Sequence, residues 1–514
     1  MKPELLNCLK NYKKTDVLHD LLAGLMVAII AMPLSIALGI QSVPEAVSPH
    51  GIQMGLVTAI IAGFFISALG GSRFQIGGPT AAFVVILFGY LANPEIGLLG
   101  LAIAGVMAGV LLIILGLCRV GSVMKFFPYP IIIGFTTGIG ITLMVGQIKD
   151  LCGFNSTGTD VIEKLVSYAQ NIGSFNPLTF VVGVVGLLCV ILLPKLNKKI
   201  PAAFVALVVC TGLSALLNGL FDAGIATIGS RYGDIKAGFF LPDFSSIGEV
   251  KFGALIVPSL VIAFLCAIES LLSASVASGL TNTPYNPNQE LLGQGVANIC
   301  SSLLGGLPAT GAIARTVAGI ENGAKSPLTG VFHAIFVLIM YFALMSVLKF
   351  VPLAVFSAIL ISVAINMSRF PLFAKLCKFG KRDTAVLIVS CVLTVVFDLT
   401  YGVIGGIVLA LLINIQNMRI KLSVVKSEDN SSTLVAKGTL YFININKFID
   451  ILNKEFESNN ELTVDLSGVE RIDASSLEKI AKLDRAVKAQ GKTLTLVGYN
   501  DKIRTRMDKF YKVF

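Results

Sequence analysis

One carboxylate and one hydroxyl lie a helical turn apart inside an apolar stretch of this chain. Glu269 occurs in the sequence AFLCAIESLLSASVASG, and Ser273 follows four residues later, on the same face of any helix formed there. A charge within such a segment is costly to bury, so it is a functional candidate. The two side chains could bind a small cation through oxygen, or the carboxylate could take up a proton. Either event would couple an ion gradient to the movement of another solute.

Two short segments interrupted by glycine and proline could bind an anion. They are GGPTAAFVVILFGY, residues 77–90, and GGLPATGAIARTVAGI, residues 305–320. About a dozen residues follow Pro79 and Ala309, roughly 18 Å of helix against about 30 Å of hydrocarbon, so neither segment can span a membrane alone. Such a pair in matching positions indicates a transporter's substrate site. Arg315, predicted to lie about a turn and a half into the short helix of the second segment, would add a positive charge there.

Composition indicates that these segments lie in a membrane. The chain has 514 residues, of which 55% are hydrophobic and only 14% are charged. Apolar runs divided by glycine, proline and charge predict about fourteen membrane segments, seven within residues 20–220 and seven within 250–418. Residues 1–19 form a short segment before them. The sequence therefore predicts a polytopic α-helical membrane protein.

Basic residues predict the orientation. They cluster in alternate connections, among them Lys10, Lys13, Lys14, Arg119, Lys195, Lys375, Arg382 and Lys421, whereas the loops at 150–177 and 220–250 are neutral to acidic. By the positive-inside rule both termini are cytoplasmic, and the net charge of +10 reflects one membrane face and no nucleic-acid partner. Seven segments per half require an inverted 7+7 repeat. The amino-terminal ends of the two short helices then meet near the midplane and form a weak anion site.

Structural alternatives exist for several of these residues. The glycines could serve only close helix packing, and Arg315 and Glu269 could simply neutralise each other as a buried ion pair. His333, in a later segment, is predicted to be a hydrogen-bonded core histidine. Ser35 is predicted to lie near the anion site, because the adjacent Pro33 could free backbone groups toward it.

The tail, residues 431–514, has a different pattern. Strand-like and helix-like stretches alternate, which predicts a small cytoplasmic α/β domain. Ser475 and Ser476 are predicted to cap the helix that follows Asp473. The chain has no P-loop, no HExxH motif and no kinase or hydrolase signature, and its nine cysteines have no metal-ligand spacing. It is therefore not expected to be an enzyme or to hold a cofactor.

Several motifs resemble the SulP (sulfate permease) family of anion transporters. They are AMPLSIALGI, GSRFQIGGPTAAF, AIESLLSASVASG and GGLPATGAIARTVAGIENGAKSPLTG, while DLSGVERIDASSLEKI in the tail resembles a STAS domain. The resemblance implies fourteen helices in a 7+7 inverted repeat, a core domain that moves against a gate domain, and a homodimer. Ala474 stands where related signalling STAS domains often carry a phosphorylated serine, so a phosphoswitch is not expected.

The resemblance also implies site residues. The anion would be bound by Thr80, Ala81, Ala312, Ile313, Ala314 and Arg315, with Ser35 nearby. The coupling ion would be bound by Glu269, Ser273 and Gly311, of which Glu269 and Ser273 are metal ligands only if that ion is sodium. Sodium-coupled bicarbonate relatives have Asp at the place of Glu269 and a hydroxyl at that of Ile313. Proton coupling or exchange is therefore expected at least as strongly.

The predicted function is secondary active transport of sulfate or bicarbonate across the cytoplasmic membrane by an elevator-like mechanism. It would be driven by a proton or sodium gradient or by anion exchange. The expected partners are the anion, the bilayer, a second copy of the chain and a cytoplasmic protein bound by the STAS-like domain. Transport of dicarboxylates or nucleobases in the same fold is one alternative. A membrane anion sensor that signals through the STAS-like domain is another.

Overall fold

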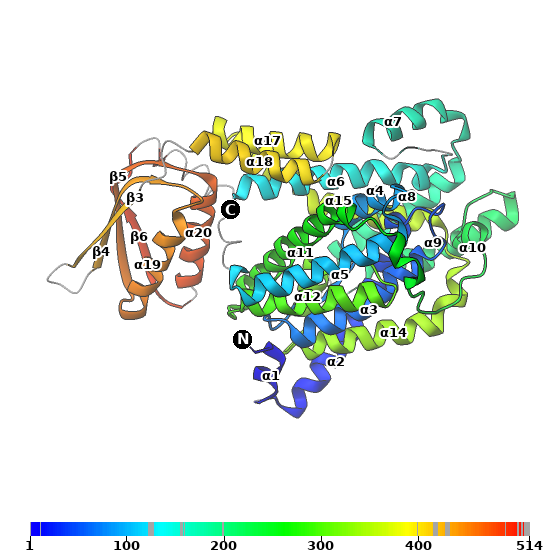
Figure 1. The fold of residues 1–514 in the computed structure, drawn as a ribbon, viewed down its shortest axis with the longest axis horizontal. Helices are drawn as coiled ribbons and strands as arrows, with labels where there is room; N and C mark the ends of the chain where they lie inside the picture. The colour runs from blue at the N-terminus through cyan, green and yellow to red at the C-terminus, as the bar shows by residue number, and fades with distance from the viewer. Residues whose placement is uncertain are drawn as a thin grey trace. The chain divides into compact units, whose positions relative to one another are not determined.

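The computed structural model describes residues 2–10, 12–121, 128–154, 158, 160–197, 200–397, 399–414, 420–426, 432–488, 490–500, 503–504 and 507. The chain forms two compact units (Figure 1). One comprises residues 1–124 and 139–366, and the other comprises residues 125–138 and 367–514. Both ends of the predicted tail domain, at residues 431 and 508–514, lie outside the described residues.

The first unit is helical. Its helices are α1 (Glu4–Leu9), α2 (Lys14–Ser42), α3 (Gly51–Leu69), α4 (Ala81–Ala92), α5 (Gly97–Leu117), the second part of α6 (Tyr129–Cys152), α7 (Val161–Gln170), α8 (Pro177–Leu196), α9 (Ala202–Phe221), α10 (Ile228–Tyr232), α11 (Phe252–Thr281), α12 (Pro287–Leu303), α13 (Ile313–Glu321), α14 (Leu328–Leu348) and α15 (Leu353–Ser368). Two 3-10 turns, η2 (Ile172–Ser174) and η3 (Phe244–Glu249), lie between them. Helices α2, α3, α5, α11, α12 and α14 pack side by side (Figure 1).

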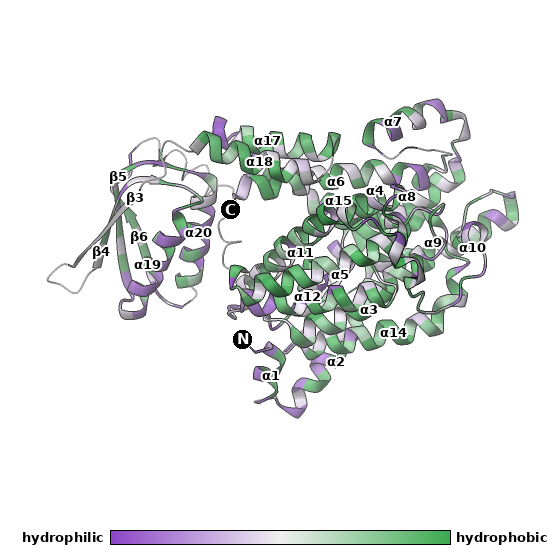
Figure 2. Ribbon diagram, viewed as in Figure 1, coloured by the Kyte–Doolittle hydropathy of each residue, from purple (hydrophilic) through white to green (hydrophobic). Residues whose placement is uncertain are grey.

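Most of these helices have membrane character. Among the described residues, nine helices are long and apolar enough to cross a bilayer, and the number of about fourteen segments stays a prediction. Hydrophobic residues predominate along the long helices in the view of Figure 2. Leu188 of α8 and Val208 of α9 remain exposed, as expected for side chains that face lipid. The chain therefore has the helical membrane fold that the sequence predicts.

Local sequence signals explain where several helices begin. Helices α8 and α12 both start with an Asn-Pro pair. Asn176 accepts hydrogen bonds from the backbone of Leu178 and Thr179, both at 3.0 Å, and Asn286 caps α12 in the same way. The proline fits the first turn because its missing N–H would have no partner there.

Asp20 connects α2, the first long helix, by hydrogen bonds to the loop that follows α13. Its buried carboxylate accepts hydrogen bonds from the backbone of Lys325 and Ser326, at 2.6 and 3.1 Å. The hydroxyls of Ser326, Thr329 and Tyr12 donate to the same carboxylate, at 2.5, 2.7 and 2.5 Å. Five donors on one buried carboxylate fix α2 against the end of the second short segment.

The second unit contains α16 (Phe370–Cys377), α17 (Lys381–Val396), α18 (Leu399–Asn414) and the tail domain. The tail has four strands in the order β3 (Ile420–Lys426), β4 (Ser432–Leu440), β5 (Glu461–Ile472) and β6 (Thr493–Val497). Strands β3 and β4 are antiparallel, while β4, β5 and β6 are parallel. The sheet thus begins before residue 431, because β3 pairs with β4.

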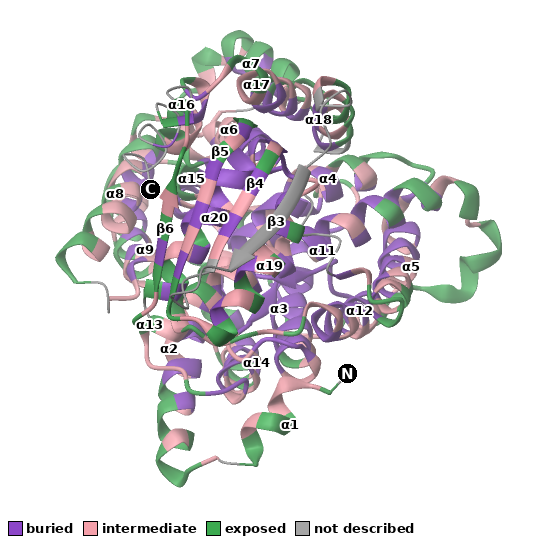
Figure 3. Cartoon of the chain, turned by 90° about the vertical axis from the view of Figure 1, so that its left-hand side faces the viewer, coloured by how far each residue is buried: buried purple, intermediate pink, exposed green. Residues whose placement is uncertain are grey.

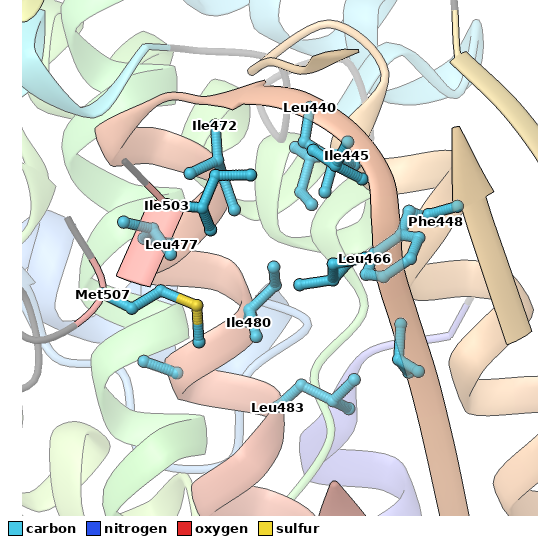
Figure 4. Close-up of a cluster of buried hydrophobic side chains, with 14 of the residues drawn as sticks. Leu440, Ile445, Phe448, Leu466, Ile472, Leu477, Ile480, Leu483, Ile503 and Met507 are labelled. Carbon is cyan, nitrogen blue, oxygen red and sulfur yellow. The ribbon is translucent and has the colours of Figure 1, made fainter. Parts of the chain in front are cut away.

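Two helices cover the tail sheet and form its core. They are α19 (Ile445–Ser458) and α20 (Ala474–Lys488). Buried and exposed residues alternate along β5 (Figure 3), and Leu440, Phe448, Leu466 and Ile480 meet in the core (Figure 4). The predicted α/β domain is confirmed.

The cap of α20 differs from the prediction. Asp473 itself precedes the helix, and its carboxylate accepts hydrogen bonds from the backbone of Ser476 at 2.7 Å and of Phe442 at 3.0 Å. Ser475 and Ser476 lie inside the first turn and are buried, so neither hydroxyl occupies the cap. Burial raises the pKa of Asp473, and the hydrogen bonds from Ser476 and Phe442 oppose that shift.

Candidate functional site

The two short segments lie side by side at the start of their helices. Strand β1 (Gly77–Gly78) pairs antiparallel with β2 (Thr310–Gly311), with Gly77 opposite Gly311 and Gly78 opposite Thr310. Helix α4 begins three residues after β1 and α13 begins two residues after β2. The pairing therefore holds the amino-terminal ends of both short helices close together.

Both helix ends lack a side-chain cap. Thr80 precedes α4 and Ala312 precedes α13, and neither makes a capping hydrogen bond. Alanine cannot cap, and the hydroxyl of Thr80 is directed to another residue. The first N–H groups of each helix therefore have no intrahelical partner, and each end carries about half a positive charge. Ala314 is exposed and Ile313 half-buried, so the rest of the protein does not cover this place completely.

Glu269 lies where the two segments meet. Its Oε2 accepts a hydrogen bond from Thr80 Oγ1 at 2.9 Å and another from Thr310 Oγ1 at 3.0 Å. One threonine belongs to each short segment, so the carboxylate of α11 joins both. No lysine or arginine among the described residues lies within 4.0 Å of it. Among the described residues, two hydroxyls bind Oε2 of this half-buried carboxylate, and a proton or a small cation could neutralise its charge.

Arg315 is the third residue of α13 and is buried. Its Nη2 donates to Ser35 Oγ at 2.9 Å, and its Nη1 donates to the carbonyl of Gly77 at 3.2 Å. Its Nε has no hydrogen-bond partner among the described residues. The guanidinium and Glu269 do not form an ion pair, so the alternative in which they neutralise each other is wrong. A full positive charge therefore remains at the base of the paired segments.

Two glycines of these segments leave space that polar side chains of neighbouring residues occupy. Gly78 has a φ of +153°, and a β carbon there would overlap Nη1 of Arg315. A β carbon at Gly311 would overlap Nε2 of Gln75, whose amide donates to the carbonyl of Ser270 at 2.9 Å. These glycines thus make room for the arginine and for a glutamine, which helix packing alone does not require.

Polar side chains of neighbouring helices fix the second segment. Asn298 of α12 accepts from the backbone N–H of Ala309 and donates to its carbonyl, both at 2.9 Å. Thr58 of α3 accepts from Leu307 N at 2.7 Å, and Ser270 of α11 accepts from Gly311 N at 2.9 Å. Because the irregular backbone is satisfied in this way, it is stable within the membrane unit.

The structure changes three details of the predicted site. Helix α13 begins at Ile313, because Thr310 and Gly311 are extended, so Arg315 lies in its first turn and not a turn and a half into it. Ser273 donates to Thr316 Oγ1 at 3.3 Å and not to Glu269. His333 is buried, but neither ring nitrogen has a hydrogen-bond partner among the described residues, so its predicted hydrogen bond is absent.

Sequence reasoning missed Thr310 as a partner of Glu269. The signal was present in the internal repeat, because GGPT and GGLPAT end on Thr80 and Thr310 at corresponding places. It also missed Gln75, since a single glutamine before a glycine pair has no distinctive spacing.

Of the predicted residues, the structure gathers Ser35, Thr80, Gly311 and Arg315 around the β1–β2 pair, with Ala81, Ala312, Ile313 and Ala314 at the helix ends.

Known proteins are similar to this chain in sequence. Residues 17–390 match the Sulfate permease family and residues 423–510 match a STAS domain. The putative sulfate transporter YvdB of Bacillus subtilis is 36% identical over 522 residues, which is 98% of this chain and 96% of the relative. The bicarbonate transporter BicA of Picosynechococcus sp. is 30% identical over 411 residues, which is 78% of this chain and 71% of that protein.

Two solved structures have a fold similar to that of this chain. The transmembrane domain of a cyanobacterium bicarbonate transporter BicA superposes with a TM-score of 0.66 at 28% identity, over 76% of this chain and 98% of that chain. SLC26A9 superposes with a TM-score of 0.71 at 18% identity, over 99% of this chain and 89% of that chain. The second likeness concerns the fold alone.

Proposed function

The chain belongs to the sulfate permease family of anion transporters, and we propose that it performs secondary active transport of a small inorganic anion, sulfate or bicarbonate. The anion binds between the ends of α4 and α13, where unpaired N–H groups of both helices converge. This convergence is the observation that carries the proposal. Two helix ends contribute about 0.3 to 2 kcal/mol each, which is weak enough to allow release after transport.

Arg315 strengthens this site through its charge. The guanidinium is held below β1 by Ser35 and the Gly77 carbonyl and has no carboxylate partner within 4.0 Å among the described residues. A buried charge acts over a longer distance than one in water, because the protein interior has a low dielectric constant. The anion therefore balances a charge that the protein leaves unpaired.

Glu269 couples anion binding to a cation. Thr80 lies directly between α4's first N–H groups and this carboxylate, so a bound anion and an ionised Glu269 are close neighbours. At about 6 Å and an effective dielectric of about 20, their repulsion is roughly 3 kcal/mol, or about a hundredfold in affinity. A proton on Glu269, or a sodium ion held by Glu269, Thr80 and Thr310, removes that repulsion. The anion then binds well only together with the cation.

The movement that exposes the site to each side is elevator-like. The site is built from α2, α3, α11, α12 and both short segments, and hydrogen bonds connect these elements through Ser35, Thr58, Glu269, Ser270 and Asn298. Such a connected block can move as one body against the rest of the transporter without losing the site.

Uptake into proteoliposomes tests the proposal. We expect saturable uptake of labelled sulfate or bicarbonate under a sodium or a proton gradient, with labelled fumarate as the control for dicarboxylate transport. Glu269→Gln should abolish the gradient dependence and keep anion exchange, because the amide is neutral in both states. The absence of saturable anion flux would refute the function, whereas unchanged cation stimulation in Glu269→Gln would refute only the role of Glu269.

We also propose that both termini face the cytoplasm and that the transporter is a homodimer. The basic residues of alternate connections, such as Lys10 and Lys195, support the orientation. In this arrangement the STAS domain is cytoplasmic and available to a protein partner. Deleting residues 420–514, which removes the whole sheet from β3 onward, tests its role. Intact flux in the truncated protein supports a regulatory tail, whereas loss of signalling without any flux in the full chain supports the sensor alternative.

A further inference from the structure

A cavity separate from the paired helix ends is lined by three basic side chains. It has a volume of about 410 Å³ and lies between α2, α4, α6, α7 and α10. We call it the lysine chamber, and its residues used below are Phe88, Gln147, Lys149, Lys164 and Arg231. A second cavity of about 600 Å³ shares Lys149 and Arg231 with it. At about 30 Å³ for each water molecule, the lysine chamber has room for a hydrated oxyanion.

Neither lysine of the chamber forms an ion pair with a described residue. The carboxylates in its wall are Glu45 and Asp150, and both bind Arg231, at 2.8 and 3.1 Å. Among the described residues, Lys149 and Lys164 have no carboxylate within 4.0 Å. The chamber wall therefore carries three basic side chains against two carboxylates, and the ammonium groups of both lysines lie outside ion pairs with described residues.

The ammonium group of Lys164 lies at the wall of the chamber, where it would contact an anion bound inside. Its Nζ lies 5.3 Å from the centroid of the Phe88 ring, which holds the ammonium at the cavity wall. Burial lowers the pKa of Lys164, and Lys149 adds to that effect, while Asp160 and Glu163 oppose it. An anion between the two lysines would relieve their mutual repulsion and restore the solvation that burial removes.

Gln147 is an uncharged polar residue of the chamber wall. Its side chain is only 1% exposed, and neither its amide nitrogen nor its amide oxygen has a hydrogen-bond partner among the described residues. A buried amide without partners is unfavourable unless a ligand or water satisfies it. Gln147 therefore offers an N–H donor to an oxyanion once its side chain turns toward the chamber, because its amide is covered in the present conformation.

The chamber and the paired helix ends share helix α4. Val84 and Phe88 of α4 line it, three and seven residues beyond Ala81 at the start of that helix. At 1.5 Å per residue they lie about 5 and 10 Å along the helix axis from the first N–H groups. The same helix therefore carries the anion site at one end and the chamber wall at the other.

We propose that the lysine chamber is a second binding site for a small inorganic oxyanion, which it captures before the anion reaches the ends of α4 and α13. Two lysines and the Gln147 amide bind the oxyanion, and the attraction raises its concentration near the transport site. The capture role rests on the proposed transport function, whereas binding in the chamber can be measured without transport.

Binding is tested with a single tryptophan. The chain contains none, so Phe88→Trp in the full-length protein places the only reporter beside Lys164. Titration with sodium sulfate should change its fluorescence saturably, and Lys164→Gln in the same background should abolish the change. Persistence of the same saturable change after Lys164→Gln would overturn the proposal, as would its absence in a Phe88→Trp protein that still transports.

Capture is tested by kinetics in proteoliposomes. Lys164→Gln should raise KM about tenfold at low ionic strength with kcat unchanged, and the difference should shrink in 0.5 M salt because the Debye length falls below about 10 Å. Lys251→Gln is the matched control, because it removes an equal charge from an exposed lysine paired with Glu95. Equal KM values for the two variants overturn the proposal, while no flux in the wild type refutes the transport function instead.

Discussion

Arg315→Gln tests whether the buried guanidinium attracts the anion by its charge. In the structure this side chain has no carboxylate within 4.0 Å among the described residues and lies in the first turn of α13. Glutamine removes the charge but leaves a polar side chain that can still hydrogen-bond to Ser35 or Gly77. The substitution therefore separates electrostatic attraction from local packing better than alanine would.

The expected magnitude depends on the valence of the anion. With about 8 Å between guanidinium and anion and an effective dielectric of about 20, each unit of anion charge gains roughly 2 kcal/mol. Bicarbonate should then lose about thirtyfold in affinity and sulfate about a thousandfold. Any structural damage weakens both anions alike, so it cancels in their ratio. We expect the ratio of sulfate to bicarbonate affinity to fall about thirtyfold.

The assay measures KM for the transported anion and the inhibition constant of the other, in proteoliposomes of fixed ionic strength. Arg315→Lys keeps the charge and should preserve the ratio, even if it weakens both anions. Ser35→Ala removes the hydrogen bond of 2.9 Å to Nη2 but leaves the charge, so it should also preserve the ratio. An equal loss for both anions in Arg315→Gln would show that the guanidinium is structural.

Three further predictions concern other parts of the chain. Gly78→Ala should abolish transport, because a β carbon there overlaps Arg315, whereas Gly89→Ala should transport normally, because nothing lies within 4 Å of a β carbon at that position. Asp20→Asn should destabilise the protein by about 2 to 4 kcal/mol, since an amide cannot accept all five hydrogen bonds of the buried carboxylate; an unchanged Tm in detergent would contradict this. Asp473→Ala should cost about 1 to 3 kcal/mol by removing the cap of α20, and limited proteolysis of the full-length protein should then cleave the tail domain faster.

The sequence predicts the class of protein well because the relevant signals are local. Long apolar runs must lie in lipid, alternating short strands and amphipathic helices must form a small α/β domain, and glycine with proline must interrupt a membrane helix. Each of these signals extends over at most a few dozen neighbouring residues. The two short segments and Glu269 could therefore be identified without coordinates.

The partners of these residues could not be identified in the same way. Glu269 receives its two hydrogen bonds from Thr80, 189 residues earlier, and Thr310, 41 residues later. The nearby Ser273, which the helical spacing favours, bonds to Thr316 instead. Spacing along one helix predicts a shared face but not what other segments bring to it.

The sequence by itself determined that this is a membrane transporter with two interrupted segments and a carboxylate within an apolar helix, because hydrophobicity and chain breaks act within single segments. Only the tertiary structure decided that β1 and β2 pair, that Arg315 lies apart from Glu269, and that Lys149 and Lys164 share one cavity. Those outcomes depend on distances between segments remote in sequence. Electrostatic energies vary with such distances and with burial, and neither quantity is contained in local composition.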